Sequence, residues 1–179
     1  SRLALSAAGQ TPFSDCFNAR ASGRRTHFYG PGVAALMSPD HFDFSGVEAR
    51  LVHFGLPGAH KTMDSPWGED STGWATVLRK ARAAGLKTNL EMVSTVASEV
   101  ARFGRSCLPH LDMLIVNDYE IGCVADMETR EGGRAAPARV VEALKAALER
   151  GPLDFAVAHF PEGALAVTRD GGVAAVGSV

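Results

Sequence analysis

Leu111–Glu120, LDMLIVNDYE, is the segment from which most of the architecture follows. Its first six residues, Leu111–Val116, are almost all apolar, which predicts a short strand buried in the centre of a parallel sheet. Polar side chains follow immediately, beginning with Asn117 and ending with Glu120. Open α/β sheets bind ligands beyond the carboxyl ends of their strands. We therefore expect Asn117–Glu120 to face a binding cleft.

Strand-like and helix-like segments alternate on both sides of this stretch. The expected strands are Glu48–Gly55, Leu86–Val93, Leu111–Val116, Phe155–Phe160 and Ala164–Thr168. The expected helices are Ser71–Ala84, capped by Ser71 or Thr72, a second one capped by Ser94 or Thr95 that ends before Pro109, and Pro137–Arg150. Apolar residues recur at helical spacing within the first and last of these segments. The alternation predicts an α/β fold: a mostly parallel sheet with helices on both faces.

The first 37 residues lack this alternation. Two strand-like runs, Pro12–Ala19 and Arg25–Tyr29, are joined by turn-prone residues and predict a β hairpin. A bare two-stranded hairpin is marginally stable in water, so we expect it to add to another sheet or another chain. The expected domains are a β lid hairpin in residues 1–37 and an α/β core in residues 38–179.

Composition and charge narrow the possible partners. The formal charge is −2 and the densest basic run is the pair Arg24-Arg25, which gives no electrostatic basis for binding nucleic acid or an anionic membrane. No apolar run approaches the roughly 18 residues of a membrane span. The three cysteines lack the CxxC spacing of a zinc site and indicate reduced thiols. We expect a cytoplasmic protein that binds a small molecule.

The Asn-x-x-Glu spacing at the strand end suits a loosely held divalent cation. The Asn117 amide orients a phosphate oxygen or a water, and the Glu120 carboxylate holds a hydrated Mg²⁺, which usually takes one or two protein carboxylates. The alternative is that Asn117 or Asp118 caps the following short helix and that Glu120 completes a capping interaction. Both interpretations stay open, because a helix N-terminus is also an anion site.

Other candidate residues carry weaker signals. Glu91 lies near a strand end and is either a cleft residue or a solvated acid, and His53 and His159 are expected to be buried, hydrogen-bonded histidines. Gly30–Ala35 matches the dinucleotide pattern G-x-G-x-x-A, which leaves a nicotinamide-dependent oxidoreductase as a third option. Its flanks argue against that option, because no apolar strand precedes it and Pro39 interrupts any helix after it.

Four landmarks together resemble the ribokinase-like (PfkB) carbohydrate kinases. They are Pro31–Leu36 (PGVAAL) after the lid hairpin, Val52–Gly55 (VHFG), the strand Leu111–Val116 running into NDYE, and His159–Ala164 (HFPEGA). The resemblance extends over nearly the whole chain, and the strand followed by Asn-x-x-Glu is its most specific element.

The resemblance implies a kinase that transfers the γ-phosphoryl group of ATP, with Mg²⁺, to a hydroxyl of a sugar or nucleoside. It implies that Asn117 and Glu120 belong to the phosphate and metal network, with Glu120 at the metal. It also implies that Phe160, Glu162 and Gly163 lie near the nucleotide phosphates. In this family two lids pair, so a homodimer through the lid is expected.

The sequence departs from the family pattern in three respects. Ala34 stands where the lid often carries Asn, and Ala158–Gly163 replaces the usual Thr-x-Gly-x-x-Gly turn. The Gly-Ala-Gly-Asp motif, which supplies the catalytic base and the anion hole, is expected beyond residue 179, and the sugar-binding strands before residue 1. We therefore expect part of a longer kinase, inactive on its own. The alternative is a non-catalytic, ligand-binding relative of sugar kinases.

Overall fold

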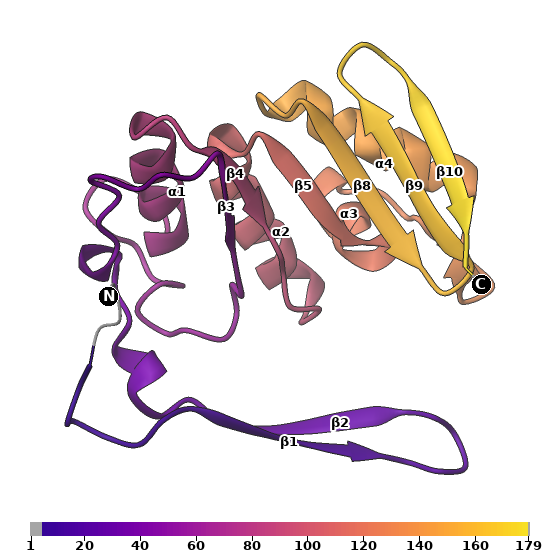
Figure 1. Cartoon of the computed structure of the whole chain (residues 1–179). Helices are drawn as coiled ribbons and strands as arrows, with labels where there is room; N and C mark the ends of the chain where they lie inside the picture. Colours follow the sequence, from indigo (N-terminus) through magenta and orange to yellow (C-terminus); the bar gives the residue numbers. More distant parts are fainter. Residues whose placement is uncertain (1–4, 179) are drawn as a thin grey trace.

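The structure is a computed structural model that describes residues 5–178. An elongated hairpin projects from a sheet with packed helices (Figure 1). In chain order the elements are β1 (Phe13–Asn18), β2 (Arg25–Gly30), the 3-10 helices η1 (Gly32–Leu36) and η2 (Pro39–His41), β3 (Leu51–Phe54), α1 (Gly73–Ala83), β4 (Lys87–Leu90), α2 (Ala97–Cys107), η3 (Leu108–His110), β5 (Met113–Asn117), α3 (Asp118–Ala125), β6 (Arg130–Glu131), β7 (Arg134–Ala135), α4 (Pro137–Arg150), β8 (Phe155–Phe160), β9 (Gly163–Thr168) and β10 (Val173–Gly177).

The main sheet has six strands in the order β10-β9-β8-β5-β4-β3. Its four strands β3, β4, β5 and β8 are parallel, and β9 and β10 continue the sheet as antiparallel neighbours. The predicted α/β fold with a mostly parallel sheet is confirmed. The expected strands 48–55 and 86–93 are shorter than predicted, because their outer residues lie beyond the ladder and form loops.

The predicted helices begin and end largely where their capping residues indicate. Thr72 caps α1, and its Oγ1 accepts a hydrogen bond from the Ala75 amide at 3.2 Å. Pro137 occupies the first position of α4, where its missing N–H leaves no bond unmade. Helix α2 differs from the prediction, because Val96 precedes it without a side-chain cap. Ser94 and Thr95, the predicted caps, instead bond to Asn117, Glu120 and Tyr119.

The helices cover only one face of the sheet. The sequence predicted helices on both faces. Helices α1 to α4 contact one another in sequence and form a single layer behind the sheet (Figure 1). Crossovers between parallel strands are right-handed. Because the chain places β3, β4, β5 and β8 in one direction across the sheet, every crossover brings its helix to the same side. Leu114 is 1 % exposed on the covered side, whereas Ile115 is 38 % exposed on the other.

The predicted hairpin is confirmed as β1 and β2, which pair antiparallel from Phe13↔Gly30 to Asn18↔Arg25. Residues facing each other across an antiparallel pair share one face. One face therefore carries Phe13, Phe17 and Phe28, and these side chains are 56–61 % exposed. The rings of Phe17 and Phe28 meet edge to face with centroids 5.4 Å apart.

Gly30–Ala35 is not a dinucleotide site. The strand before it belongs to the exposed hairpin, and only the 3-10 turn η1 follows, so the βαβ unit that the fingerprint requires is not formed. Among the residues the structure describes, no helix combines the length and apolarity needed to cross a membrane.

Candidate functional site

Asn117 and Glu120 form a capping box at the start of α3. The Asn117 Oδ1 accepts from the Glu120 amide at 2.8 Å, and Glu120 Oε2 accepts from the Asn117 amide at 3.0 Å. The capping interpretation of the motif is therefore correct. The box also places a carboxylate at the carboxyl end of β5, because α3 follows that strand without a linker.

Ser94 completes this cluster, and we had assigned it only as a possible helix cap. Its hydroxyl donates to Glu120 Oε1 at 2.7 Å and accepts from Asn117 Nδ2 at 2.7 Å. Ser94 follows β4, the neighbour of β5, so the two strand ends meet through it. The one available signal in the sequence was its position just beyond a predicted strand.

The oxygen atoms of this cluster suit a magnesium ion contacted through its bound waters better than one coordinated directly by the protein. Its donors are carboxylate, amide and hydroxyl oxygens, the types that Mg²⁺ prefers. Each Glu120 oxygen already accepts one hydrogen bond, and the residue is only 4 % exposed. No group of three or more His, Cys, Asp or Glu that could hold a metal occurs within residues 5–178. Glu120 and Ser94 would thus hold the waters of the ion.

Asp118 takes no part in this cluster's hydrogen bonds and instead pairs with Arg130; its carboxylate is 3 % exposed and the Arg130 side chain 42 % exposed. Its carboxylate accepts from Arg130 Nε and Nη2 at 2.6 and 2.9 Å. Burial raises the pKa of Asp118, but the hydrogen bonds and charge of Arg130 outweigh it, so the pKa lies below its usual value. Thr129 Oγ1 also donates to the Asp118 carbonyl at 2.6 Å. The segment after α3 is therefore tied to the helix start.

Acid should remove the stabilisation that this ion pair supplies. The folded-state pKa of Asp118 is depressed, so its contribution is present above the unfolded-state pKa and is lost as pH falls through the folded-state pKa. We expect Asp118→Asn to lower the free energy of unfolding by about 1–3 kcal/mol at pH 7. The difference from the wild type, measured by urea unfolding, should be constant near neutral pH and should narrow as pH falls below the unfolded-state pKa toward the lower folded-state pKa. A deficit that stays the same down to the lowest pH at which the wild type remains folded would contradict this account.

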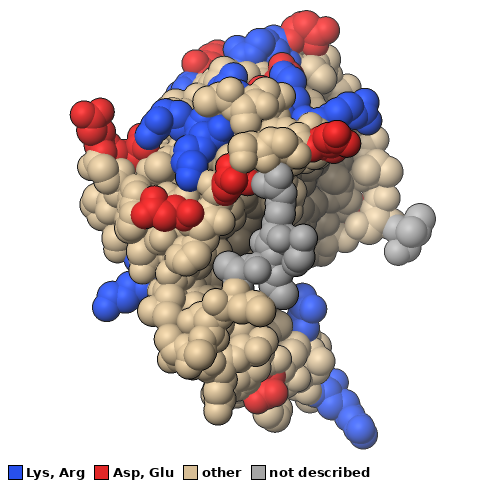
Figure 2. Space-filling view, turned by 60° about the vertical axis from the view of Figure 1, so that its left-hand side comes forward, with Lys and Arg blue, Asp and Glu red and all other residues tan. Residues whose placement is uncertain are grey.

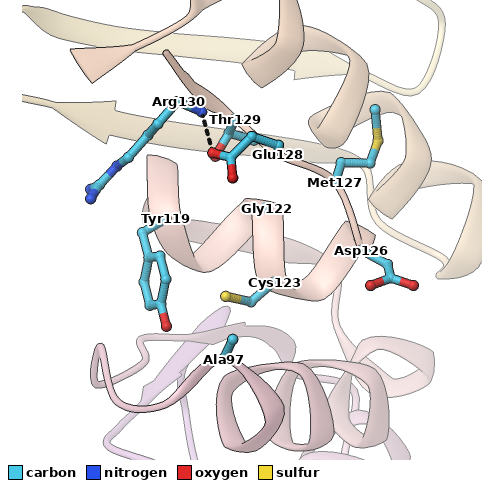
Figure 3. A pocket seen from close by; sticks show the side chains of 9 residues that line it. All are labelled: Ala97, Tyr119, Gly122, Cys123, Asp126, Met127, Glu128, Thr129 and Arg130. Atoms are coloured by element: carbon cyan, nitrogen blue, oxygen red, sulfur yellow. Dashed lines mark hydrogen bonds between the residues drawn. The ribbon is translucent and has the colours of Figure 1, made fainter. Parts of the chain in front are cut away.

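A cavity of about 310 Å³ lies between α3 and the segment that follows it (Figure 3). The Cys123 thiol and the Tyr119 ring project from α3 into it, and burial raises the pKa of Cys123. Its lining residues are Ala97, Tyr119, Gly122, Cys123, Asp126, Met127, Glu128, Thr129 and Arg130. None of the predicted site residues lines this cavity.

The second predicted group lies at the end of β8, beside β5. Asn117 pairs with His159 in the ladder, which brings the cluster at Asn117 next to the turn at Phe160–Gly163. Phe160 packs against the core, and a Cβ on Gly163 would lie 2.1 Å from the Val176 carbonyl. Gly163 is thus required for close approach to β10. The Glu162 side chain is 40 % exposed, and its Oε1 lies 2.7 Å from Arg134 Nη2.

His53 and His159 are exposed, which corrects the expectation that they are buried. Both alternate onto the sheet face that the helices leave uncovered. His53 lies between Glu91 Oε2, 3.3 Å from its Nε2, and Asn89 Nδ2, 2.8 Å from its Nδ1. Glu91 is therefore an exposed, paired acid on that face. The Asn89 Oδ1 is buried and has no hydrogen-bond partner among the described residues.

The lid hairpin lies across the end of the sheet toward which β5 and β8 run (Figure 1). It faces the strand ends that carry the Asn117 and Glu162 groups. In Figure 2 acidic and basic side chains intermingle over the sheet-and-helix region, whereas most of the projecting lower part is uncharged. One face of the lid is thus mainly apolar, with Asp15 as its one acidic residue among β1 and β2, and the hairpin projects on the side of the sheet where these strands end.

Comparisons with known proteins identify the architecture. No protein-family model matches the chain, and no curated protein matches it in sequence. The solved structure of Sa239 is similar over 97 % of this chain and 50 % of its own, with a TM-score of 0.72 and 13 % identity. Adenosine kinase from Trypanosoma brucei brucei is similar over 98 % and 52 %, with a TM-score of 0.65 and 18 % identity.

A third similar structure is ribokinase from Cryptococcus neoformans var. grubii serotype A in complex with ADP. It is similar over 98 % of this chain and 53 % of its own, with a TM-score of 0.63 and 13 % identity. The chain has the ribokinase-like fold. It spans about half the length of these solved structures. The ribokinase-like fold explains why a hairpin lid and an open α/β sheet occur in one chain.

Proposed function

We propose that this chain is the central part of a kinase that uses ATP and Mg²⁺ to phosphorylate a hydroxyl of a sugar or nucleoside. The observation that carries the proposal is the meeting of two polar strand ends, Asn117–Glu120 at the end of β5 and His159–Gly163 at the end of β8, on the side of the sheet where the lid projects. Similar structures are named as adenosine kinase, ribokinase and phosphofructokinase-2. We place the division between lid and core after residue 37 and the protein in the cytoplasm.

The residues of this chain would position the nucleotide phosphates and the waters of the metal ion. They would not accept the proton of the acceptor hydroxyl. In the proposed reaction the acceptor hydroxyl attacks the γ-phosphorus, the bond to the β-γ bridging oxygen breaks, and ADP leaves. The hydroxyl proton passes to a base that the resemblance assigns to a Gly-Ala-Gly-Asp motif, which this sequence does not contain. When bound, Mg²⁺ would neutralise charge on the phosphates. Asn117 and Glu120 would orient its waters, and Phe160, Glu162 and Gly163 would flank the nucleotide.

The test is phosphoryl transfer from ATP by the full-length gene product across a panel of sugars and nucleosides. Turnover that requires Mg²⁺ and produces ADP together with a phosphorylated acceptor is the expected result. If every acceptor in the panel stays unphosphorylated while the protein is folded, the kinase proposal fails.

A ligand-binding relative without catalysis is the second candidate. Two observations favour it: both Glu120 oxygens are engaged within the protein, and the turn at Phe160–Gly163 lacks the usual threonine and first glycine. Such a protein would bind a sugar or nucleoside without transferring phosphate. Saturable binding by calorimetry with no turnover would select this candidate.

We further propose that two copies pair through their lids. The face with Phe13, Phe17 and Phe28 has no covering side chains within residues 5–178, and a bare apolar ribbon is unstable in water. We expect Phe28→Asp to convert a dimer into a monomer in sedimentation at micromolar concentration. His27→Asp, on the opposite face, is the matched control and should stay dimeric. A monomeric wild type would refute lid pairing.

A further inference from the structure

A small hairpin after α3 brings two arginines to the two polar strand ends. Strands β6 and β7 pair Arg130↔Ala135 and Glu131↔Arg134, and the glycines between them both have positive φ, 57° and 80°. Arg130 reaches Asp118 beside the β5 end, and Arg134 reaches Glu162 in the turn after β8. This short hairpin, formed by β6 and β7, thus contacts both parts of the candidate site.

The Arg130 contact anchors this hairpin. The guanidinium binds a carboxylate that is only 3 % exposed, and both of its nitrogens donate. Thr129 adds a hydrogen bond to the Asp118 carbonyl, and the Ala136 amide donates to the Thr129 carbonyl at 2.9 Å. Paired hydrogen bonds between arginine and carboxylate restrict geometry as well as adding energy. The base of the hairpin is therefore held firmly on α3.

The Arg134 contact is of a different kind. One nitrogen meets Glu162 Oε1 at 2.7 Å, and the side chains of Arg134 and Glu162 are 74 % and 40 % exposed. Exposed ion pairs of this type contribute little to stability and are screened by salt. Arg134 is thus free to exchange its partner without disturbing the fold.

An acid at Glu162 poses an electrostatic problem for a nucleotide. If the phosphates lie over the turn after β8, an unpaired carboxylate there would repel them. Arg134 neutralises that charge in the structure. A guanidinium also matches the geometry of phosphate oxygens and binds them through charge-assisted hydrogen bonds.

We propose that Arg134 is a phosphate-binding residue that leaves Glu162 for the polyphosphate chain of the nucleotide. The inference rests on the proposed function, because it assumes that a nucleotide occupies the ends of β5 and β8. The Arg130 anchor keeps the hairpin beside these ends, and the exposed Glu162 holds Arg134 close until phosphate arrives. Arg134 supplies the positive charge that the altered turn lacks.

Calorimetric titration of Mg·ATP into the full-length gene product and its variants tests the proposal. Arg134→Gln should weaken Mg·ATP binding about 10- to 100-fold, the value of one charge-assisted hydrogen bond. Binding of adenosine, which lacks phosphate, should be unchanged. Lys145→Gln, the same charge change on the exposed side of α4, is the matched control and should bind as the wild type does.

The double variant Arg134→Gln/Glu162→Gln separates a direct contact from simple neutralisation. Continued weak binding would support a direct contact between Arg134 and phosphate. Recovery to the wild-type affinity would overturn it, because Arg134 would then act only by cancelling Glu162.

A second readout separates this inference from the kinase proposal. The Nε–Hε resonance of Arg134 should shift when inorganic tripolyphosphate is added to the wild-type full-length protein. Failure of the full-length protein to bind Mg·ATP would refute nucleotide binding, whereas an Arg134 resonance that does not shift with tripolyphosphate would refute the role of Arg134. Mg·ATP binding that is equally tight in Arg134→Gln refutes the role of Arg134 alone.

Discussion

If the proposed kinase activity is correct, Glu120→Gln should lower the turnover of the full-length gene product about 100-fold, the cost of losing one fixed charge-stabilising group. It should also raise the Mg²⁺ concentration needed for half-maximal activity about 10- to 100-fold, as loss of an outer-shell partner does. Glutamine serves as well as glutamate at the third position of a capping box. The substitution therefore removes the charge while it preserves the acceptor for the Asn117 amide, now 3.0 Å from Glu120 Oε2. Steady-state rates across a magnesium titration measure both effects.

The controls distinguish a cap from a metal-supporting residue. The free energy of unfolding of Glu120→Gln should change by no more than about 1–2 kcal/mol, since the cap remains and one hydrogen bond from Ser94 is lost. Glu142→Gln, an exposed position on α4, should leave both rate and magnesium requirement unchanged. If Glu120→Gln retains wild-type turnover at low Mg²⁺, Glu120 is a cap and nothing more.

Leu114→Ala should lower the free energy of unfolding of this chain by about 2–5 kcal/mol, as for other leucines truncated in a packed core. Leu114 is 1 % exposed and lies on the side of β5 that the helix layer covers. Truncation to alanine would leave a cavity at this position, because the site is closed to solvent and its neighbours are already packed. Guanidinium unfolding of the purified chain measures the loss.

Ile115→Ala is the matched comparison, one residue along the same strand and on the opposite face. Ile115 is 38 % exposed, so its truncation should cost about 1 kcal/mol or less. Equal losses at the two positions would mean that both faces of the sheet are covered, contrary to the single helix layer.

Local sequence was sufficient for elements whose signals lie within one turn or one strand. Helix α4 begins at Pro137 and ends at Arg150 as predicted, because the start residue, the apolar stripe and Gly151 all lie in one segment. The strand β8 is likewise Phe155–Phe160 as predicted. The start of α2 was predicted wrongly: the Ser94 hydroxyl bonds to Asn117 and Glu120, the Thr95 carbonyl accepts from the Tyr119 hydroxyl, and the helix begins after Val96.

Part of the candidate site could also be predicted from local sequence and part could not. Asn117 and Glu120 could be predicted, because they lie three residues apart directly after a strand-like segment. Ser94 is 23 residues from Asn117, and Arg134 is 28 residues from Glu162, so the bonds that join them depend on strand order. Neither contact follows from spacing along the chain.

The amino-acid sequence alone therefore determined a buried strand before the Asn-x-x-Glu motif, the lid hairpin and a mostly parallel sheet. These depend on apolar periodicity and on turn and capping preferences, which act over a few residues. The strand runs from Met113 to Asn117, two residues later at its start than the predicted Leu111–Val116. Only the tertiary structure decided that the helices lie on one face, that Ser94 closes the cluster at Glu120 and that Arg134 meets Glu162. The reason is that sheet order and right-handed crossovers bring distant segments together, and no short-range preference encodes that order.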